Sequence, residues 1–161
     1  MSFSDTACSQ GNDKQIVKLD ESLLQQATSV SYSFDNGTVA PDYRYDCWVT
    51  VSKDSVRLSV IAGYGKEEKM DSIVPLQAGQ YEQFIASLVN LSIAKVPLRG
   101  PMPVGGPVYK FWVYGDDSTL FGGEEDYDLH VRNGSLSNTF YMLLPPELQN
   151  IMKNPEQLME R

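Results

Sequence analysis

The chain has 161 residues, of which 42% are hydrophobic and 11% aromatic. This length and apolar content suit one globular domain and exclude a wholly disordered chain, because the buried surface can offset the entropy of ordering. With 21 acidic against 13 basic side chains, the net charge of −8 opposes phosphate backbones, so nucleic acid is not an expected partner. No apolar stretch approaches the ~20 residues that a transmembrane segment requires.

The amino-terminal stretch 1–14 is polar and has neither a basic start nor an apolar run. We expect it to form a flexible segment ahead of a single globular domain over 15–161, and we expect a cytoplasmic protein. The alternative is a bacterial surface lipoprotein tethered through Cys8, because Ala7-Cys8-Ser9 and the polar residues after it resemble a lipidation site. Cys8 and Cys47 lie too far apart to indicate a metal site, and reduced thiols are expected.

Hydrophobic spacing predicts the elements of the first half. Apolar residues three to four apart predict a short helix within 16–27. Alternation of apolar and polar residues predicts strands over 30–34, 43–51 and 56–62, the last two joined by a turn at 52–54 into an antiparallel hairpin. Cys47 falls on the apolar side of its strand. The mixed-charge run 66–72 is typical of a solvated connection and is assigned to a loop.

The second half begins with the most regular helical pattern, over 81–89, where Tyr81, Phe84 and Leu88 share one face. Proline and glycine exclude regular structure from Pro97 to Pro107, which is expected to be a long loop. Further strands are predicted over 109–113, 119–121 and 127–131, with a turn at Asp116-Asp117, followed by a helical turn at 140–144 and a helix from Pro146 to Lys153.

This order favours an α+β fold, a largely antiparallel sheet of about six strands packed with two to three helices. Tyr45-x-x-Trp48-Val49 echoes Tyr109-x-x-Trp112-Val113, which is compatible with a βββα pseudo-repeat, but similar hairpins also look alike without duplication. Both tryptophans lie opposite the apolar rows of their strands. We expect a helix to cover that face, the alternative being a contact surface for another protein.

The stretch around His130, the single histidine of the chain, is the most charged candidate site. If Tyr127, Leu129 and Val131 face the core, alternation places Asp126, Asp128 and His130 together on the other side. We interpret this side as a solvated surface. The alternatives are a partner-binding acidic face and a metal or acid/base site, although no second histidine or cysteine pair completes a ligand set.

Catalytic motifs are not apparent. Cys47 is predicted to point inward, the chain lacks a Gly-x-Ser-x-Gly elbow, and the Gly105-Gly106 loop lacks a phosphate-binding lysine. We therefore expect no enzyme and no cofactor, but a non-catalytic protein-binding module, most concretely an acidic inhibitor or immunity-type protein that masks a basic toxin or enzyme. The lipoprotein and a small metal-assisted enzyme using His130 are the alternatives. The predicted partner-binding residues are Asp116, Asp117, Glu124, Glu125, Asp126, Asp128 and His130.

Overall fold

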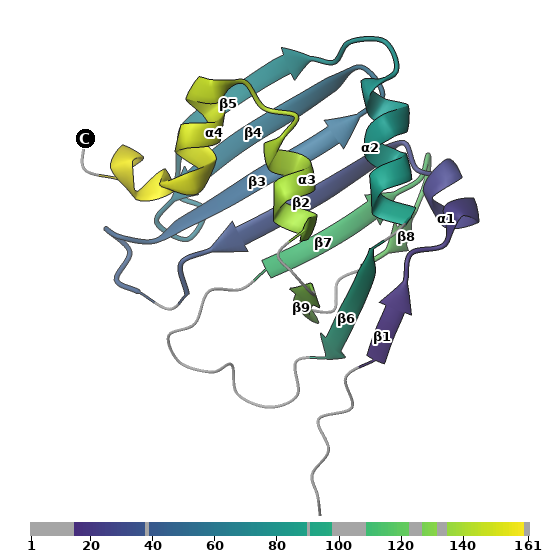
Figure 1. Ribbon diagram of the computed structural model, residues 1–161. Helices are drawn as coiled ribbons and strands as arrows, with labels where there is room; N and C mark the ends of the chain where they lie inside the picture. Colours follow the sequence, from purple (N-terminus) through teal and green to yellow (C-terminus); the bar gives the residue numbers. More distant parts are fainter. Residues whose placement is uncertain are drawn as a thin grey trace, which may run out of the picture.

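A six-stranded antiparallel sheet forms the centre of the molecule, with strand order β5-β4-β3-β2-β7-β8 (Figure 1). The computed structural model describes residues 15–37, 39–89, 91–97, 109–122, 127–131 and 135–159. The strands of the central sheet are β2 (Ser29–Asp35), β3 (Tyr45–Ser52), β4 (Ser55–Ala62), β5 (Glu67–Pro75), β7 (Tyr109–Tyr114) and β8 (Thr119–Phe121).

A second, three-stranded antiparallel sheet has the order β1-β6-β9. It consists of β1 (Gln15–Lys18), β6 (Ser92–Pro97) and β9 (Tyr127–Val131). The helical elements are α1 (Glu21–Gln25), α2 (Gln80–Val89), α3 (Ser135–Tyr141), α4 (Pro146–Lys153) and the short 3-10 helix η2 (Pro155–Leu158). The predicted α+β class with a largely antiparallel sheet is confirmed, whereas the pseudo-repeat stays a prediction.

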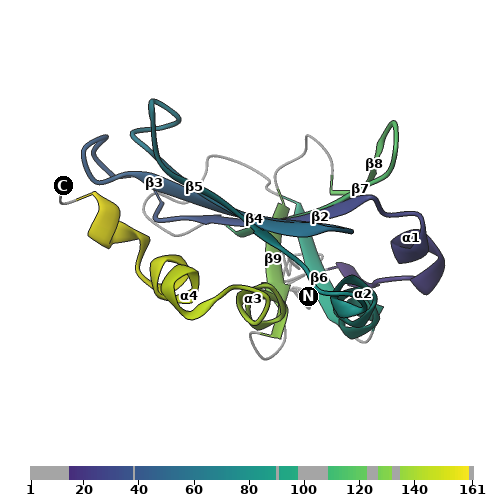
Figure 2. The same ribbon diagram turned by 90° about the horizontal axis from the view of Figure 1, so that it is seen from above.

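Strand alternation gives the central sheet two different faces. On β2, Val30 and Tyr32 join the hydrophobic core, and Ser31 and Ser33 lie on the opposite face. Helices α2, α3 and α4 lie on the apolar side, as Figure 2 shows in a view along the sheet. Their contribution to the core includes Phe84, Leu88, Leu136, Phe140, Leu148 and Met152. We call this side the covered face and the other side the open face.

The first predicted helix is wrong in its amino-terminal part. Residues 15–18 form β1, in which Ile16 pairs with Ala94, and the helix begins only at Glu21. The physical reason is the cap: the Asp20 carboxylate accepts a hydrogen bond from the Ser22 amide at 3.1 Å, which fixes the helix start. Ile16 shares the helical spacing of Leu19 and Leu23 but lies ahead of this cap.

The loop predicted over 66–72 is also wrong from Glu67 on, because the strand β5 begins there. Its register with β4 opposes Val74 to Val56 and Met70 to Val60, so inward apolar residues alternate with outward ones. Since β5 is the outermost strand of the described sheet, Glu67, Glu68 and Asp71 remain exposed to water without disturbing the core. The mixed charge therefore indicates an edge strand in this case.

Several other predictions are confirmed. The β3–β4 hairpin, the buried Cys47, α2, and the start of α4 at Pro146 all agree with the sequence patterns. The strand β6 was not predicted, and residues 98–108, which contain most of the predicted proline loop, lie outside the described residues. The predicted flexible segment 1–14 lies outside them as well.

Candidate functional site

The predicted acidic site is only partly within the described residues. Residues 123–126, which include Glu124, Glu125 and Asp126, lie outside them. Asp128 and His130 lie on β9, where they pair in register with Val96 and Ala94 of β6. The strand is confirmed, although it joins the small sheet and not the central one. The orientation of these two side chains lies outside what the structure describes, so the solvated-surface interpretation and its alternatives stay predictions.

Asp116 and Asp117 occupy the bend between β7 and β8, and both are exposed. The predicted turn is therefore confirmed. The bend is separated along the chain from β9, and β8 and β9 belong to different sheets. Across the described ranges, no three His, Cys, Asp or Glu side chains gather in an arrangement that could hold a metal ion.

The two tryptophans share the open face, as alternation predicts. Trp48 pairs with Ser33 from one side of β2, and Trp112 pairs with Ser31 from the other. Among the described residues no helix covers them, because α2, α3 and α4 all pack on the covered face, where the larger apolar surface lies (Figure 2). Gly122, with φ of +92°, approaches Trp112 so closely that a Cβ would lie 2.9 Å from its ring.

A buried ion-pair network lies on the open face, at the end of β2. Arg44 donates hydrogen bonds to Asp35 Oδ1 and Asp46 Oδ1, both at 2.9 Å, and to the Gly37 carbonyl. The guanidinium carbon lies 4.9 Å from the centroid of the Tyr64 ring. Burial raises the pKa of Asp46 even though Arg44 acts in the opposite direction. Because the partners of Arg44 lie at the end of β2, at the start of β3 and in the segment between them, we assign this network a structural role.

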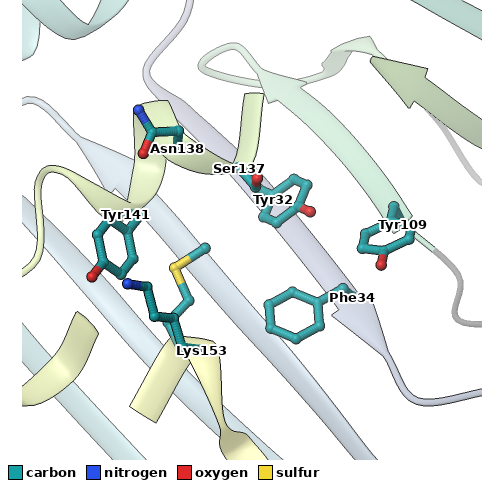
Figure 3. A pocket seen from close by; sticks show the side chains of 8 residues that line it. Tyr32, Phe34, Tyr109, Ser137, Asn138, Tyr141 and Lys153 are labelled. Carbon is teal, nitrogen blue, oxygen red and sulfur yellow. The ribbon is translucent and has the colours of Figure 1, made fainter. Parts of the chain in front are cut away.

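A pocket of about 420 Å³ lies on the covered face, between the sheet and the last two α-helices. Figure 3 shows its side chains: one group comes from β2 and β7, and the other from α3 and α4. The lining residues are Tyr32, Phe34, Tyr109, Ser137, Asn138, Tyr141, Met152 and Lys153. This pocket is the candidate functional site, because concave, largely apolar sites of this size commonly hold small ligands.

Strand register builds the aromatic floor of the pocket. Phe34 and Tyr109 are direct cross-strand partners, and Tyr32 precedes Phe34 by two residues on the same face. The ring centroids of Tyr32 and Tyr109 are 6.4 Å apart, and those of Phe34 and Tyr109 are 6.3 Å apart. Tyr109 is 40% exposed, whereas Tyr32 is 5% exposed, so the floor runs from the core to the surface.

The inner end of this floor is continuous with the aromatic core. The fully buried Phe140 of α3 stacks on Tyr32 with a centroid distance of 5.5 Å and meets Phe84 of α2 edge-on at 5.1 Å. These contacts fix α3 against both the sheet and α2. Packed rings therefore close the inner end of the pocket, and its exposed end lies at Tyr109 and Lys153.

The helix side of the pocket supplies its polar groups. Ser137, Asn138 and Tyr141 lie within one turn of α3, and Lys153 ends α4. The ammonium nitrogen of Lys153 lies 4.5 Å from the centroid of the Tyr141 ring, which links the two helices by a cation–π contact (Figure 3). The Gln149 side-chain amide also donates to the Tyr141 carbonyl at 3.1 Å. These contacts preorganise this wall.

Three titratable groups in and near the pocket, Tyr32, Tyr45 and Cys47, have raised pKa values. Burial, and to a smaller extent neighbouring Tyr109, raises the pKa of Tyr32, and a side-chain hydrogen bond with Ser137 acts in the opposite direction. Burial likewise raises the pKa of Tyr45, whose ring meets Phe34 edge-on at 6.4 Å. Burial raises the pKa of the Cys47 thiol to about 12, so this thiol is not an activated nucleophile at neutral pH.

No family model, curated protein or solved structure matches this chain. Within the described part of the chain, no helix is both long enough and apolar enough to cross a membrane.

Sequence patterns did not reveal the pocket. The floor residues Tyr32, Phe34 and Tyr109 have the spacing of ordinary core residues, and none of the helix-side residues was singled out. One signal was present: α3 places polar Ser137 and Asn138 beside the aromatic pair Phe140-Tyr141, so its face toward the sheet is not uniformly apolar. Such a mixed face is typical of a helix at the edge of a core.

Proposed function

We propose that this chain is a non-catalytic binding protein whose ligand site is the pocket between the sheet and helices α3 and α4. The observation that carries the proposal is the aromatic floor, which continues from the buried Tyr32 to the partly exposed Tyr109 and faces a polar helix wall. The volume of the pocket, about 420 Å³, lies within the range of small-ligand sites, roughly 300 to 1,000 Å³. The apolar part of a ligand would pack against the rings, and its polar atoms would point toward α3 and α4.

The chemistry of the lining residues favours binding over catalysis. The Tyr32 hydroxyl is protonated at neutral pH, and burial raises its pKa further from the range in which it could act as a base, so it acts in hydrogen bonding. Of the other polar groups, Ser137 is hydrogen-bonded to Tyr32, and Lys153 rests on an aromatic ring. The eight lining residues include no histidine, cysteine or carboxylate, which are the usual partners of an activated nucleophile.

Titration with naphthylmethanol, a neutral aromatic probe, tests this proposal. Amide chemical shifts should change in α3, at the end of α4 and along β2, because the probe would displace water from the ring floor. Tyr109→Ala should weaken binding about tenfold, since it removes the most exposed ring of that floor. Tyr43→Ala, at a ring that is 70% exposed and outside the pocket lining, is the matched control. Equal binding by both variants would refute the assignment.

Protein binding is the second candidate function, and the open face favours it. This face carries Trp48 and Trp112 without a helix of the described chain above them, and Asp116 and Asp117 are exposed at the neighbouring bend. Together with the net charge of −8, this suits the basic toxin or enzyme expected from composition.

A binding measurement at several salt concentrations tests that second function. A basic partner recovered from the native host should associate more slowly as salt rises, because screening weakens electrostatic steering. Substituting both Asp116 and Asp117 with asparagine should slow association further, whereas Asp54→Asn in the β3–β4 turn should have a smaller effect. An association rate that does not respond to salt would count against a charge-guided complex.

A further inference from the structure

The charge of the pocket lining narrows the class of its ligand. Among the eight lining residues, Lys153 is the one with a formally charged side chain. It forms no ion pair with a carboxylate of the described residues, and its ammonium group contacts the Tyr141 ring. A cation–π contact holds the ammonium group in place without neutralising it. The positive charge therefore remains available to a ligand at the pocket.

The floor favours a flat ring system over a flexible chain. The rings of Tyr32, Phe34 and Tyr109 have interplanar angles between 24° and 43° and lie on one side of the sheet. Such rings offer an offset-stacking surface, and aromatic pairs gain energy beyond the area that they bury. A planar ligand also loses less conformational entropy on binding than an alkyl chain does.

We propose that the ligand is a planar aromatic molecule with one anionic group, whose rings lie on Tyr32, Phe34 and Tyr109 and whose anion pairs with Lys153. This inference rests on the proposed function and specifies its ligand. The amide of Asn138 supplies a hydrogen-bond donor on the same helix wall. The anion would attract the Lys153 ammonium from the side that the Tyr141 ring leaves open.

The overall charge of the chain favours the opposite sign of ligand, so the two effects must be compared. The net charge of −8 is distributed over the whole chain and is screened beyond about 8 Å at physiological ionic strength. Lys153 acts at contact distance, where the interaction energy of two charges is larger than at the distances of the remaining charges. The charge of Lys153 should therefore determine which sign of ligand the pocket prefers. A cationic ligand would additionally have to displace Lys153 from the Tyr141 ring.

Three probes with the same ring system test the proposal by isothermal titration: naphthoate, naphthylmethanol and naphthylmethylamine. Naphthoate should bind about tenfold more tightly than naphthylmethanol, because a charge-assisted pair with Lys153 is added to the same ring contacts. Lys153→Met should remove this difference, because both probes lose the same cation–π support of the wall and only naphthoate also loses a charge-assisted pair. Lys66→Met, at an exposed lysine in the β4–β5 turn, should preserve the difference.

The outcomes separate this inference from the proposed function. If none of the probes binds, the pocket is not a ligand site and both proposals fail. If naphthoate and naphthylmethanol bind equally, or naphthylmethylamine binds best, the site stands and the anionic ligand is refuted. Decanoate, an anion without rings, tests whether the ligand must be planar and aromatic. If decanoate binds at least as tightly as naphthoate, the planar ring system is refuted. Thermal denaturation of each variant verifies that it is folded.

Discussion

The two faces of the central sheet bury their residues in chemically different ways. On β2, Val30 is fully buried in the apolar core under the helices, and its neighbour Ser31 is 3% exposed on the open face. The serine hydroxyl lies 2.8 Å from the Thr50 hydroxyl and has Trp112 as a cross-strand neighbour. The same low exposure thus accompanies apolar packing on one face and hydrogen bonding on the other. The exposed fraction of a residue therefore does not show whether its position requires an apolar side chain or a hydrogen-bonding one.

Phe140→Ala should produce the largest loss of stability. The side chain is fully buried on the covered face and contacts the rings of Tyr32, Phe84 and Phe111. Removing it leaves a cavity and should lower the free energy of unfolding by about 3 to 5 kcal/mol. Chemical denaturation measures the change. Met142→Ala is the control two residues away, because Met142 is 66% exposed, and a comparable loss there would contradict the assigned faces.

Arg44→Met should be the most damaging substitution on the open face. It leaves Asp35, at 8% exposure, and Asp46 without their shared cationic partner. Breaking a buried ion pair should lower the free energy of unfolding by about 2 to 4 kcal/mol. Adding Asp35→Asn to Arg44→Met should restore part of this loss, because the amide carries no charge. A double variant less stable than the single one would contradict this explanation.

The raised pKa of the Cys47 thiol predicts that the stability of the protein falls at alkaline pH. Its pKa is raised from 9.0 to about 12 in the folded protein, so the unfolded chain releases the proton first as pH rises. Stability is therefore full below about pH 9 and falls above it, by about 1 kcal/mol per pH unit for this group. Cys47→Ala should reduce that decline. Denaturation curves from neutral to alkaline pH measure it, and an unchanged slope in the variant would contradict the assigned cause.

Arg57→Met should have the smallest effect. The Arg57 guanidinium and the Asp71 carboxylate form a bidentate pair at 2.6 Å on the exposed part of the open face. The Asp71 pKa is lowered, first by the hydrogen bond from Arg57, but solvent and salt weaken such surface pairs. The unfolding midpoint of the variant should approach that of the parent as salt rises. A loss equal to that of Arg44→Met would show that exposure does not distinguish the two arginines.

Regular alternation allowed much of the central sheet to be predicted. The β3–β4 hairpin and β7 follow directly from two-residue periods, because each strand has one face in the core. β5 was missed because Glu67, Glu68 and Lys69 obscure the alternation of Met70 and Val74, although an edge strand tolerates those charges. The strand β9 was found, but its place in the second sheet depends on pairing with β6, which lies thirty or more positions earlier in the chain.

The pocket could not be predicted from local patterns for a related reason. Its floor residues have core spacing, and only the placement of α3 and α4 decides that Tyr109 remains partly exposed while Phe111, two residues along the same strand, is fully enclosed. Likewise, Tyr141 and Lys153 come together across two helices separated by Pro145. Such contacts arise from tertiary packing, which periodicity within one segment does not encode.

The outer strands of the central sheet also bear on how the protein behaves at high concentration. Exposed backbone amides and carbonyls on a sheet margin can template the addition of a foreign strand and start fibrous growth. One margin of this sheet is the charge-rich β5, and the other is β8, with only three residues. Electrostatic repulsion at one edge and shortness at the other therefore discourage copies of the chain from pairing edge to edge into a continuous sheet.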